Sequence, residues 1–268
     1  MNAGMWAWNL IGYLRFFGQL LNGDRFAGER TIATRRERDL APHLVARQNL
    51  RVLDLANGNL RPQYELLKFA GHCVVGIDLA NRPRTGLSAQ AYKLARWLYG
   101  RSLPRMQTQR LVCGDVGALP FPNDHFDFVT SVAAFEHFLH VPQVVAELER
   151  VVKPGGVMWV GIHPFTGPSG GHNLGFVEIP LRHMPRGVDP WDHLRKRRLP
   201  LTVPLNKWRL HQYRAEFARH FQIVKEYCVT REGGLLLTPA LQAELAAYDS
   251  DELTCAAYVI VARKTAKE

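Results

Sequence analysis

Acidic residues follow three short apolar runs of this chain, each at the point where a strand would end. Asp54 lies within VLDLANGN (52–59), Asp78 closes CVVGID (73–78), and Asp115 follows a third run. In a parallel sheet covered by helices, ligands bind outside the carboxyl ends of the strands. An ionised carboxylate only accepts hydrogen bonds, so three of them together suit a ligand that carries hydroxyl and amino donors.

The loop after the first of these strands is rich in small residues. Ala56 and Gly58 follow Asp54 there, and small side chains let the backbone approach a ligand closely. A helix expected over 61–70, with a proline in its first turn, would aim its N-terminal dipole at this loop and favour a carboxylate on the ligand. A nicotinamide cofactor is disfavoured because the GxGxxG phosphate cradle is absent.

Histidines gather after the later strands. Glu136 and His137 follow one strand, His163 ends the next, and His172 lies in the glycine-rich stretch 168–173, which suits a mobile lid. These residues are the candidates for a general base, with packed or capping side chains as the alternative. His163, His172 and Glu136 are metal-ligating types, but their spacing matches no known motif, so no metal is expected.

Strand and helix patterns that would position these residues alternate along the chain. Strands are expected over residues 50–55, 73–78, 110–113, 126–133, 157–162, 222–229 and 253–262. Helices are expected over residues 6–21, 29–48, 61–70, 88–99, 142–152, 206–220 and 239–248. Continuous apolar strands that alternate with helices predict a parallel sheet covered on both faces.

The segment 164–204 breaks this alternation and is too long for an ordinary loop, so a functional role is expected. Trp191 either stacks on a ring or sugar face of a bound ligand or packs as a core aromatic, and His193 lies beside it in the sequence. Arg195 opens a basic run that either meets a phosphate on the ligand or forms a solvated rim. We therefore take Trp191, His193 and Arg195 as candidate substrate-binding residues.

Composition excludes several classes of protein. The 268 residues are 47% hydrophobic, which suffices for a sizeable core and argues against disorder. Four scattered cysteines without a CxxC pair exclude a disulfide framework and an ordinary zinc finger. No transmembrane run and no secretory signal are visible, so a cytoplasmic protein is expected. The apolar segment 6–21 leaves a packed helix, a lid and a peripheral membrane contact open.

The net charge of +10 is concentrated in one part of the chain. Residues 182–231 carry twelve Lys and Arg against four Asp and Glu. Such a concentration indicates either an anionic partner or a solvated basic face. Nucleic acid is the less favoured partner, because no RNA-binding module accompanies this stretch.

Five segments together resemble the class I S-adenosylmethionine-dependent methyltransferases of the small-molecule, type 11-like kind. They are VLDLANGN (52–59), VVGIDLA (74–80), CGDVGALPFPNDHFDFV (113–129), AFEH (134–137) and VVKPGG (151–156). The resemblance implies a Rossmann-like, doubly wound α/β fold. Its seven-stranded sheet has an antiparallel last strand and lies within a three-layer αβα sandwich.

The resemblance and the alternation together predict a single methyltransferase domain over 1–268. Within it we expect an N-terminal helical lid (1–48), a cofactor-binding core (49–163), an inserted acceptor lid (164–205) and a C-terminal part of the sheet (206–268).

The resemblance also implies a cofactor, S-adenosyl-L-methionine, and residues that hold its methionine end. Asp54, Ala56 and Gly58 would line that end, and Ser131 and Ala133 would lie under the sulfonium.

Other strand-end residues would hold the adenosine end of the same cofactor. Asp78, with Leu79 beside it, would accept the two ribose hydroxyls. Asp115 would accept the adenine amino group, and the backbone amide of Val116 would reach a ring nitrogen.

One feature departs from the family pattern, whose first loop carries three alternating glycines. Here Ala56 replaces the first and Leu60 the third. Replacement of glycine by alanine has a mild effect if the backbone keeps a negative φ, whereas leucine is a bulkier replacement. Weakened cofactor binding and lost activity both stay open.

The expected function is methyl transfer to a small molecule, with an oxygen as the favoured acceptor atom on a natural product, a sugar or a lipid-linked intermediate. Two alternatives remain: an RNA methyltransferase and a non-catalytic binding protein of the same fold. The RNA alternative lacks the Asn/Asp-Pro-Pro-aromatic tetrad that base N-methyltransferases of this fold often carry after the fourth strand.

Overall fold

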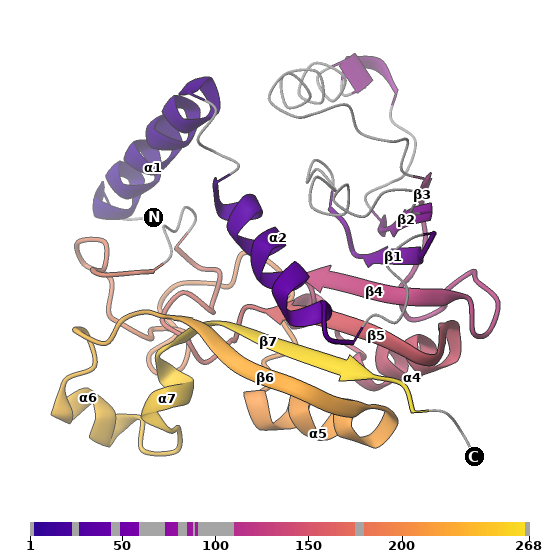
Figure 1. Cartoon of the computed structure of the whole chain (residues 1–268). Coiled ribbons are helices and arrows are strands. Elements are labelled where there is room, and N and C mark those ends of the chain that lie inside the picture. The colour runs from indigo at the N-terminus through magenta and orange to yellow at the C-terminus, as the bar shows by residue number, and fades with distance from the viewer. Residues whose placement is uncertain are drawn as a thin grey trace.

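The computed structural model describes residues 3–22, 27–43, 49–58, 73–79, 85–87, 89–90, 110–174 and 180–265. Within these residues seven strands form one sheet in the order β3-β2-β1-β4-β5-β7-β6 (Figure 1). Strands that precede and follow the long interruption therefore belong to the same sheet.

Most strands of this sheet run in parallel. The parallel set is β1 (Arg51–Leu55), β2 (Cys73–Ile77), β3 (Arg110–Val112), β4 (Phe126–Val132) and β5 (Val152–Ile162). The antiparallel neighbours are β7 (Cys255–Arg263), which pairs with β5, and β6 (Gln222–Arg231), which pairs with β7. The predicted doubly wound sheet with an antiparallel last strand is confirmed. Its order reverses between β1 and β4, the switch point at which such sheets bind ligands.

Helices cover both faces of the sheet (Figure 1). They are α2 (Ala27–Leu40) on one face and α4 (Val141–Val151) and α5 (Leu210–His220) on the other. In α4, Val144, Val145 and Leu148 recur at helical spacing and are buried against the strands. On the opposite face, Leu40 of α2 packs into a second core with Trp159 of β5. The three-layer αβα arrangement is thus the one expected.

Several boundaries differ from the sequence expectation. The motif at 153–156 is expected to separate a helix from a strand, yet β5 already begins at Val152, which pairs with Phe126. The pairing register then shifts before Phe128 pairs with Val157, so the proline and glycines lie in an irregular part of the strand. Near the C-terminus a short helix that the pattern does not predict, α7 (Ser250–Leu253), precedes β7.

The long interruption between β5 and α5 forms turns without a helix or strand in its described part, 163–174 and 180–209. The N-terminal helix α1 (Ala3–Asn22) packs on it through Met5, which contacts a small core of Leu174, Leu181 and Val188. The pairing of an N-terminal lid with an acceptor lid stays a prediction, but these two segments do share a core.

Several other expectations are tested only in part. The helix expected over 61–70 and most of the one over 88–99 lie outside the described residues, as does Leu60. Helix α6 (Pro239–Glu244) begins as expected, because the Thr238 side chain accepts a hydrogen bond from the Leu241 backbone at 3.3 Å. In the described part of the chain, no helix combines the length and the apolar character needed to cross a membrane.

Candidate active site

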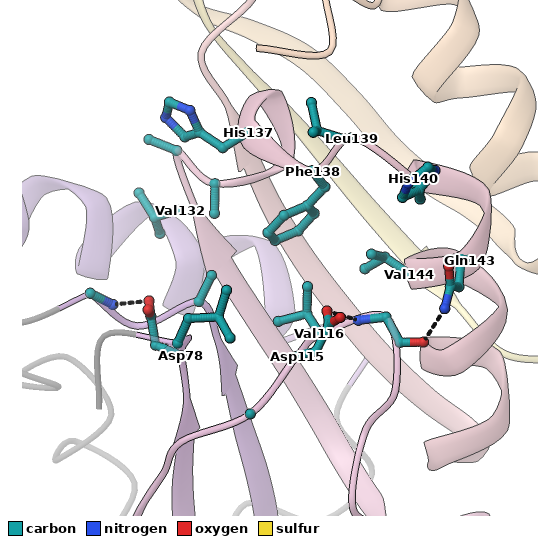
Figure 2. Close-up of a pocket in the computed structure, with 17 residues that line it drawn as sticks. Asp78, Asp115, Val116, Val132, His137, Phe138, Leu139, His140, Gln143 and Val144 are labelled. Atoms are coloured by element: carbon teal, nitrogen blue, oxygen red, sulfur yellow. Dashed lines mark hydrogen bonds between the residues drawn. The ribbon is translucent and has the colours of Figure 1, made fainter. Parts of the chain in front are cut away.

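The carboxyl ends of the central parallel strands open into a pocket of about 580 Å³. Figure 2 shows Asp78 and Asp115 on one side of it and His137 on another. Eight of the predicted site residues line it: Ala56, Gly58, Asp78, Leu79, Asp115, Val116, Ala133 and His137. Segments that are far apart in the sequence therefore meet at one cavity.

Asp78 ties two of these segments together. Its Oδ2 accepts a hydrogen bond from the Gly58 backbone at 2.8 Å (Figure 2), and the Ala56 backbone donates to the Ile77 carbonyl at 2.8 Å. The loop after β1 is thus held against the end of β2. Asp54 precedes this loop, is 6% exposed and does not belong to the residues that line the pocket.

Asp115 is held by its own turn. Its Oδ1 accepts a hydrogen bond from the Gly117 backbone at 2.8 Å, and the Gln143 side chain donates to the Gly117 carbonyl at 2.8 Å (Figure 2). Helix α4, which carries Gln143, therefore fixes the position of the Asp115 carboxylate at the edge of the pocket. The neighbouring Val116 lines the same wall.

Two alanines of the pocket adopt a left-handed backbone. Ala56 has a φ of +54° and Ala133 a φ of +49°. A left-handed conformation costs an L-residue about 1–2 kcal/mol. The condition under which alanine in the first loop would be mild, a negative φ, is therefore not met. Ser131 is fully buried within β4 and does not line the pocket.

Three imidazoles form a row that starts at the pocket. The His172 ring centroid lies 4.9 Å from that of His137 and 4.9 Å from that of His163. Glu136, only 1% exposed, shares a short 3-10 turn with His137 directly after β4. The four candidate catalytic residues thus lie near one another, and among these four described residues His137 is the one that lines the pocket.

His163 is connected to a buried carboxylate. Its Nε2 lies 2.8 Å from the Ser169 hydroxyl, which donates to Oε1 of Glu232. Glu232 also accepts from the backbones of Ser169 at 3.1 Å and Leu181 at 3.0 Å. Since the serine hydrogen points to the carboxylate, Nε2 of His163 is the donor and Nδ1 keeps its lone pair.

Comparison with known proteins agrees with this geometry. Residues 53–160 match the family described as a methyltransferase domain. A sterol 24-C-methyltransferase of Gibberella zeae is 32% identical over 145 residues, which are 54% of this chain and 35% of that protein. These findings support a methyltransferase domain of the class I S-adenosylmethionine-dependent kind over residues 53–160. The family resemblance predicted from the five motifs is confirmed.

Another curated relative is matched over a shorter stretch of the chain. A malonyl-[acyl-carrier protein] O-methyltransferase of Halorhodospira halophila is 39% identical over 67 residues, 25% of this chain and 23% of that protein. The present chain thus spans about a third or less of the length of these two curated relatives.

Solved structures show the same fold. A protein from the complex with the Haloferax volcanii Trm112 methyltransferase activator has a TM-score of 0.52 and 15% identity, over 93% of this chain and 97% of its own. A protein of Pyrococcus horikoshii OT3 has a TM-score of 0.51 and 21% identity, over 87% and 91%.

Two members of the histidine row, His163 and His172, are neutral at physiological pH. Burial, and secondarily the neighbouring imidazoles of His172, His137 and His193, lower the pKa of His163 to about 3. Burial and two neighbouring imidazoles also lower the pKa of His172 to about 4. Both rings are therefore uncharged, and such low pKa values make them weak bases in their buried surroundings.

Close packing, rather than mobility, explains the glycines before His172. A Cβ on Gly170 would lie 2.1 Å from the Pro164 carbonyl oxygen, and one on Gly171 would lie 2.5 Å from the His193 ring. The segment is buried and His172 itself has a φ of +48°. The structure thus shows a packed wall where the composition suggests a mobile lid.

The three candidate substrate-binding residues of the insertion do not reach the pocket. Trp191 has no exposed surface, and its indole donates to the carbonyls of Thr166 at 3.0 Å and Leu253 at 3.2 Å. Trp191 is therefore a packed side chain, but its ring lies mainly against Leu241, Leu245 and Leu253, which are outside the insertion. His193 is 3% exposed with Nε2 at 2.8 Å from the Phe165 carbonyl, and Arg195 pairs with Glu244.

The basic stretch is largely neutralised within the chain. Eight of its twelve Lys and Arg form ion pairs, among them Lys196 and Arg198 with Asp189, and Arg209 with Glu252. This pattern favours the solvated basic rim over a dedicated anion site.

Sequence reasoning missed Ser169, Glu232 and Gln143. A rule applied to the other strands identifies one of them: β6 runs in the same direction as β5, so Glu232 follows the carboxyl end of β6 at the same edge of the sheet. No local pattern connects Glu232 with Ser169, which is 63 residues away.

Proposed function

We propose that this chain transfers the methyl group of S-adenosylmethionine to an oxygen atom of a small-molecule acceptor. The observation that carries the proposal is the pocket itself. It places two carboxylates from neighbouring strand ends on one side and the first member of a histidine row on another. Its volume of about 580 Å³ lies in the range of cofactor-sized sites.

The residues of the adenosine end suit the donors and acceptors of a nucleoside. Asp78 would accept the two ribose hydroxyls, because an ionised carboxylate has acceptor sites beyond the one that Gly58 occupies. Asp115 would accept the adenine amino group, with the Val116 amide at a ring nitrogen. Leu79 is 67% exposed at the pocket and supplies an apolar surface for the base.

The methionine end would lie at the loop after β1. The backbones of Ala56 and Gly58 line the pocket there, with the Asp54 carboxylate buried behind them. Ala133 would lie beside the sulfonium, and Ser131, two residues earlier in the chain, would lie deeper within β4. When bound, the cofactor supplies a methyl group activated by the positive sulfur.

An oxygen acceptor must lose its proton, and His163 is the proposed proton acceptor. Its Nδ1 has a lone pair because Nε2 donates to Ser169. When Nδ1 takes the proton, the Ser169–Glu232 pair stabilises the imidazolium that forms. His137 and His172 lie between His163 and the pocket and would contact the acceptor.

The printed names of two relatives favour a lipid-like or carrier-linked acceptor. One acts on a sterol and the other on a malonyl group carried by a protein. In this chain α1 also exposes large apolar side chains, including Trp6 at 61% and Leu14 at 62%. Among the expected classes we therefore place lipid-linked intermediates first.

Calorimetric titration with S-adenosylmethionine and S-adenosylhomocysteine tests the cofactor part. Transfer of radiolabelled methyl groups to a panel of sterols, acyl thioesters, phenols and sugars then tests the acceptor. We expect saturable binding and transfer to a member of the lipid-like group. Absence of binding at millimolar ligand would refute the proposal, and salt-sensitive transfer to tRNA would move it to the RNA class.

A further inference from the structure

Glu136, His137 and His172 bring three metal-ligating side chains together. One ring nitrogen of each histidine and one carboxylate oxygen of Glu136 all lie within 4.8 Å of one another. Glu136 and His137 are adjacent in the turn after β4, whereas His172 comes from the insertion. The fold rather than the local sequence brings this set together, and it contains His137 in place of the His163 that the sequence offers as a metal-ligating type.

The orientation of His137 is fixed by a backbone carbonyl. Its Nδ1 lies 3.0 Å from the Pro204 oxygen, and a carbonyl only accepts, so Nδ1 carries the hydrogen. The other nitrogen, Nε2, then has the lone pair that a metal requires. Metal-binding histidines usually show this arrangement, with the remote N–H given to a carbonyl or carboxylate.

His172 contributes a ring nitrogen, Nε2, that is buried in an energetically unfavourable environment unless a ligand contacts it. Its Nε2 is buried and, among the described residues, has no hydrogen-bond partner. A buried polar atom without a partner destabilises the folded state. The backbone is held on both sides of the ring, since the His172 carbonyl accepts from Thr202 and its amide donates to the Ser169 carbonyl at 3.2 Å.

Glu136 supplies the negative charge that a metal site needs. Its side chain is almost wholly buried beside the two imidazoles. The turn that carries it is anchored, because Asn206 donates from its backbone to the Glu136 carbonyl at 2.9 Å and from its side chain to the Phe135 carbonyl at 2.7 Å. The three ligands are therefore held by the protein before any ion arrives.

We propose that Glu136, His137 and His172 bind a divalent transition metal, with zinc as the best match. Two imidazoles and one carboxylate form a ligand set used by catalytic zinc, which leaves a further coordination position open. Ligands around tetrahedral zinc lie about 3.3 Å apart, so rotations that move the side-chain atoms by about 1 Å close the present spacing.

The open position would take an oxygen of the acceptor, a part of the proposal that rests on the proposed function. His137 lines the pocket, so the metal lies at the pocket wall. A metal-bound hydroxyl loses its proton more readily. The proton passes to water, a bond forms between the oxygen and the methyl carbon, and the sulfur–methyl bond breaks to leave a neutral thioether.

Titration of the full-length, chelator-treated protein with Co²⁺ and Zn²⁺ tests the site. We expect one equivalent of Co²⁺ to give a visible ligand-field band and Zn²⁺ to displace it. His172→Ala and His137→Ala should each weaken binding by at least about tenfold. His211→Ala, an exposed histidine on α5, is the matched control and should leave binding unchanged.

Two results would overturn the metal site: no saturable cobalt band, or equal affinity in wild type, His172→Ala and His137→Ala when circular dichroism shows both variants folded. A parallel titration with S-adenosylhomocysteine separates this failure from that of the proposed function. If the protein binds S-adenosylhomocysteine but not cobalt, the metal site alone is refuted. If it binds cobalt but not S-adenosylhomocysteine, the methyltransferase proposal alone is refuted.

Discussion

The two ends of the pocket are built in different ways. At the cofactor end each carboxylate follows a strand and is held by a nearby backbone, Asp78 by Gly58 and Asp115 by Gly117. At the acceptor end the groups come from the turn after β4, the end of β5, the insertion and the end of β6. Contacts such as that between Ser169 and Glu232 join segments 63 residues apart. The comparison indicates that cofactor affinity and acceptor activation can be altered separately.

The largest effect should come from Asp78→Ala. Two charge-assisted hydrogen bonds to the ribose would be lost, at about 1.5–3 kcal/mol each, so affinity for S-adenosylhomocysteine should fall at least about a hundredfold. Calorimetry measures the change. Asp189→Ala, in the insertion, is the control and should bind normally. Unchanged affinity in Asp78→Ala would remove Asp78 from the ribose role.

His163→Ala should affect the acceptor end alone. Loss of a general base lowers turnover by about a hundredfold or more, whereas the affinity for S-adenosylhomocysteine should stay within about twofold. Steady-state kinetics and calorimetry on the same preparation give both values. If turnover survives in both His163→Ala and His172→Ala, neither residue is the base. The acceptor end would then not be separated from the cofactor end by a catalytic role of these histidines.

The buried His193 should make stability depend on pH. Burial lowers its pKa to about 4, and the hydrogen bond to the Phe165 carbonyl opposes this in part. Below about pH 6.5 the unfolded chain binds a proton that the folded chain rejects. His193 should therefore lower the free energy of unfolding between pH 6.5 and pH 4 by up to about 1.4 kcal/mol per unit, and His163 and His172 add to the fall in the same direction. Urea unfolding at pH 7.5, 6 and 5 checks this, and His193→Gln should flatten the slope.

Ala56→Gly should have the smallest effect. Glycine relieves the positive φ of +54° and should stabilise the fold by about 1 kcal/mol, as measured by thermal or urea unfolding. Ala118→Gly, in an exposed turn at a position without positive φ, is the control and should not stabilise. An unchanged or lower midpoint for Ala56→Gly would contradict the strain assigned to this loop.

The cofactor end could be predicted from the sequence because strand ends are local features. Asp78 and Asp115 each follow an apolar run, and parallel pairing necessarily brings such ends to one edge. The acceptor end could be predicted only as a set of candidate histidines. The roles of Trp191 and Arg195 depend on what the insertion packs against, and Trp191 packs against leucines of the C-terminal segment. Regular spacing encodes the sheet, whereas contacts of an irregular segment leave no periodic pattern.

A crystal structure of the full chain with S-adenosylhomocysteine tests the central claim most directly. The account predicts the ribose hydroxyls on Asp78, the adenine between Leu79 and Val116, and the sulfur directed toward the end of the pocket where His137 lies. Product bound elsewhere, or a ribose placed away from Asp78 with the sulfur remote from the histidine row, would contradict it.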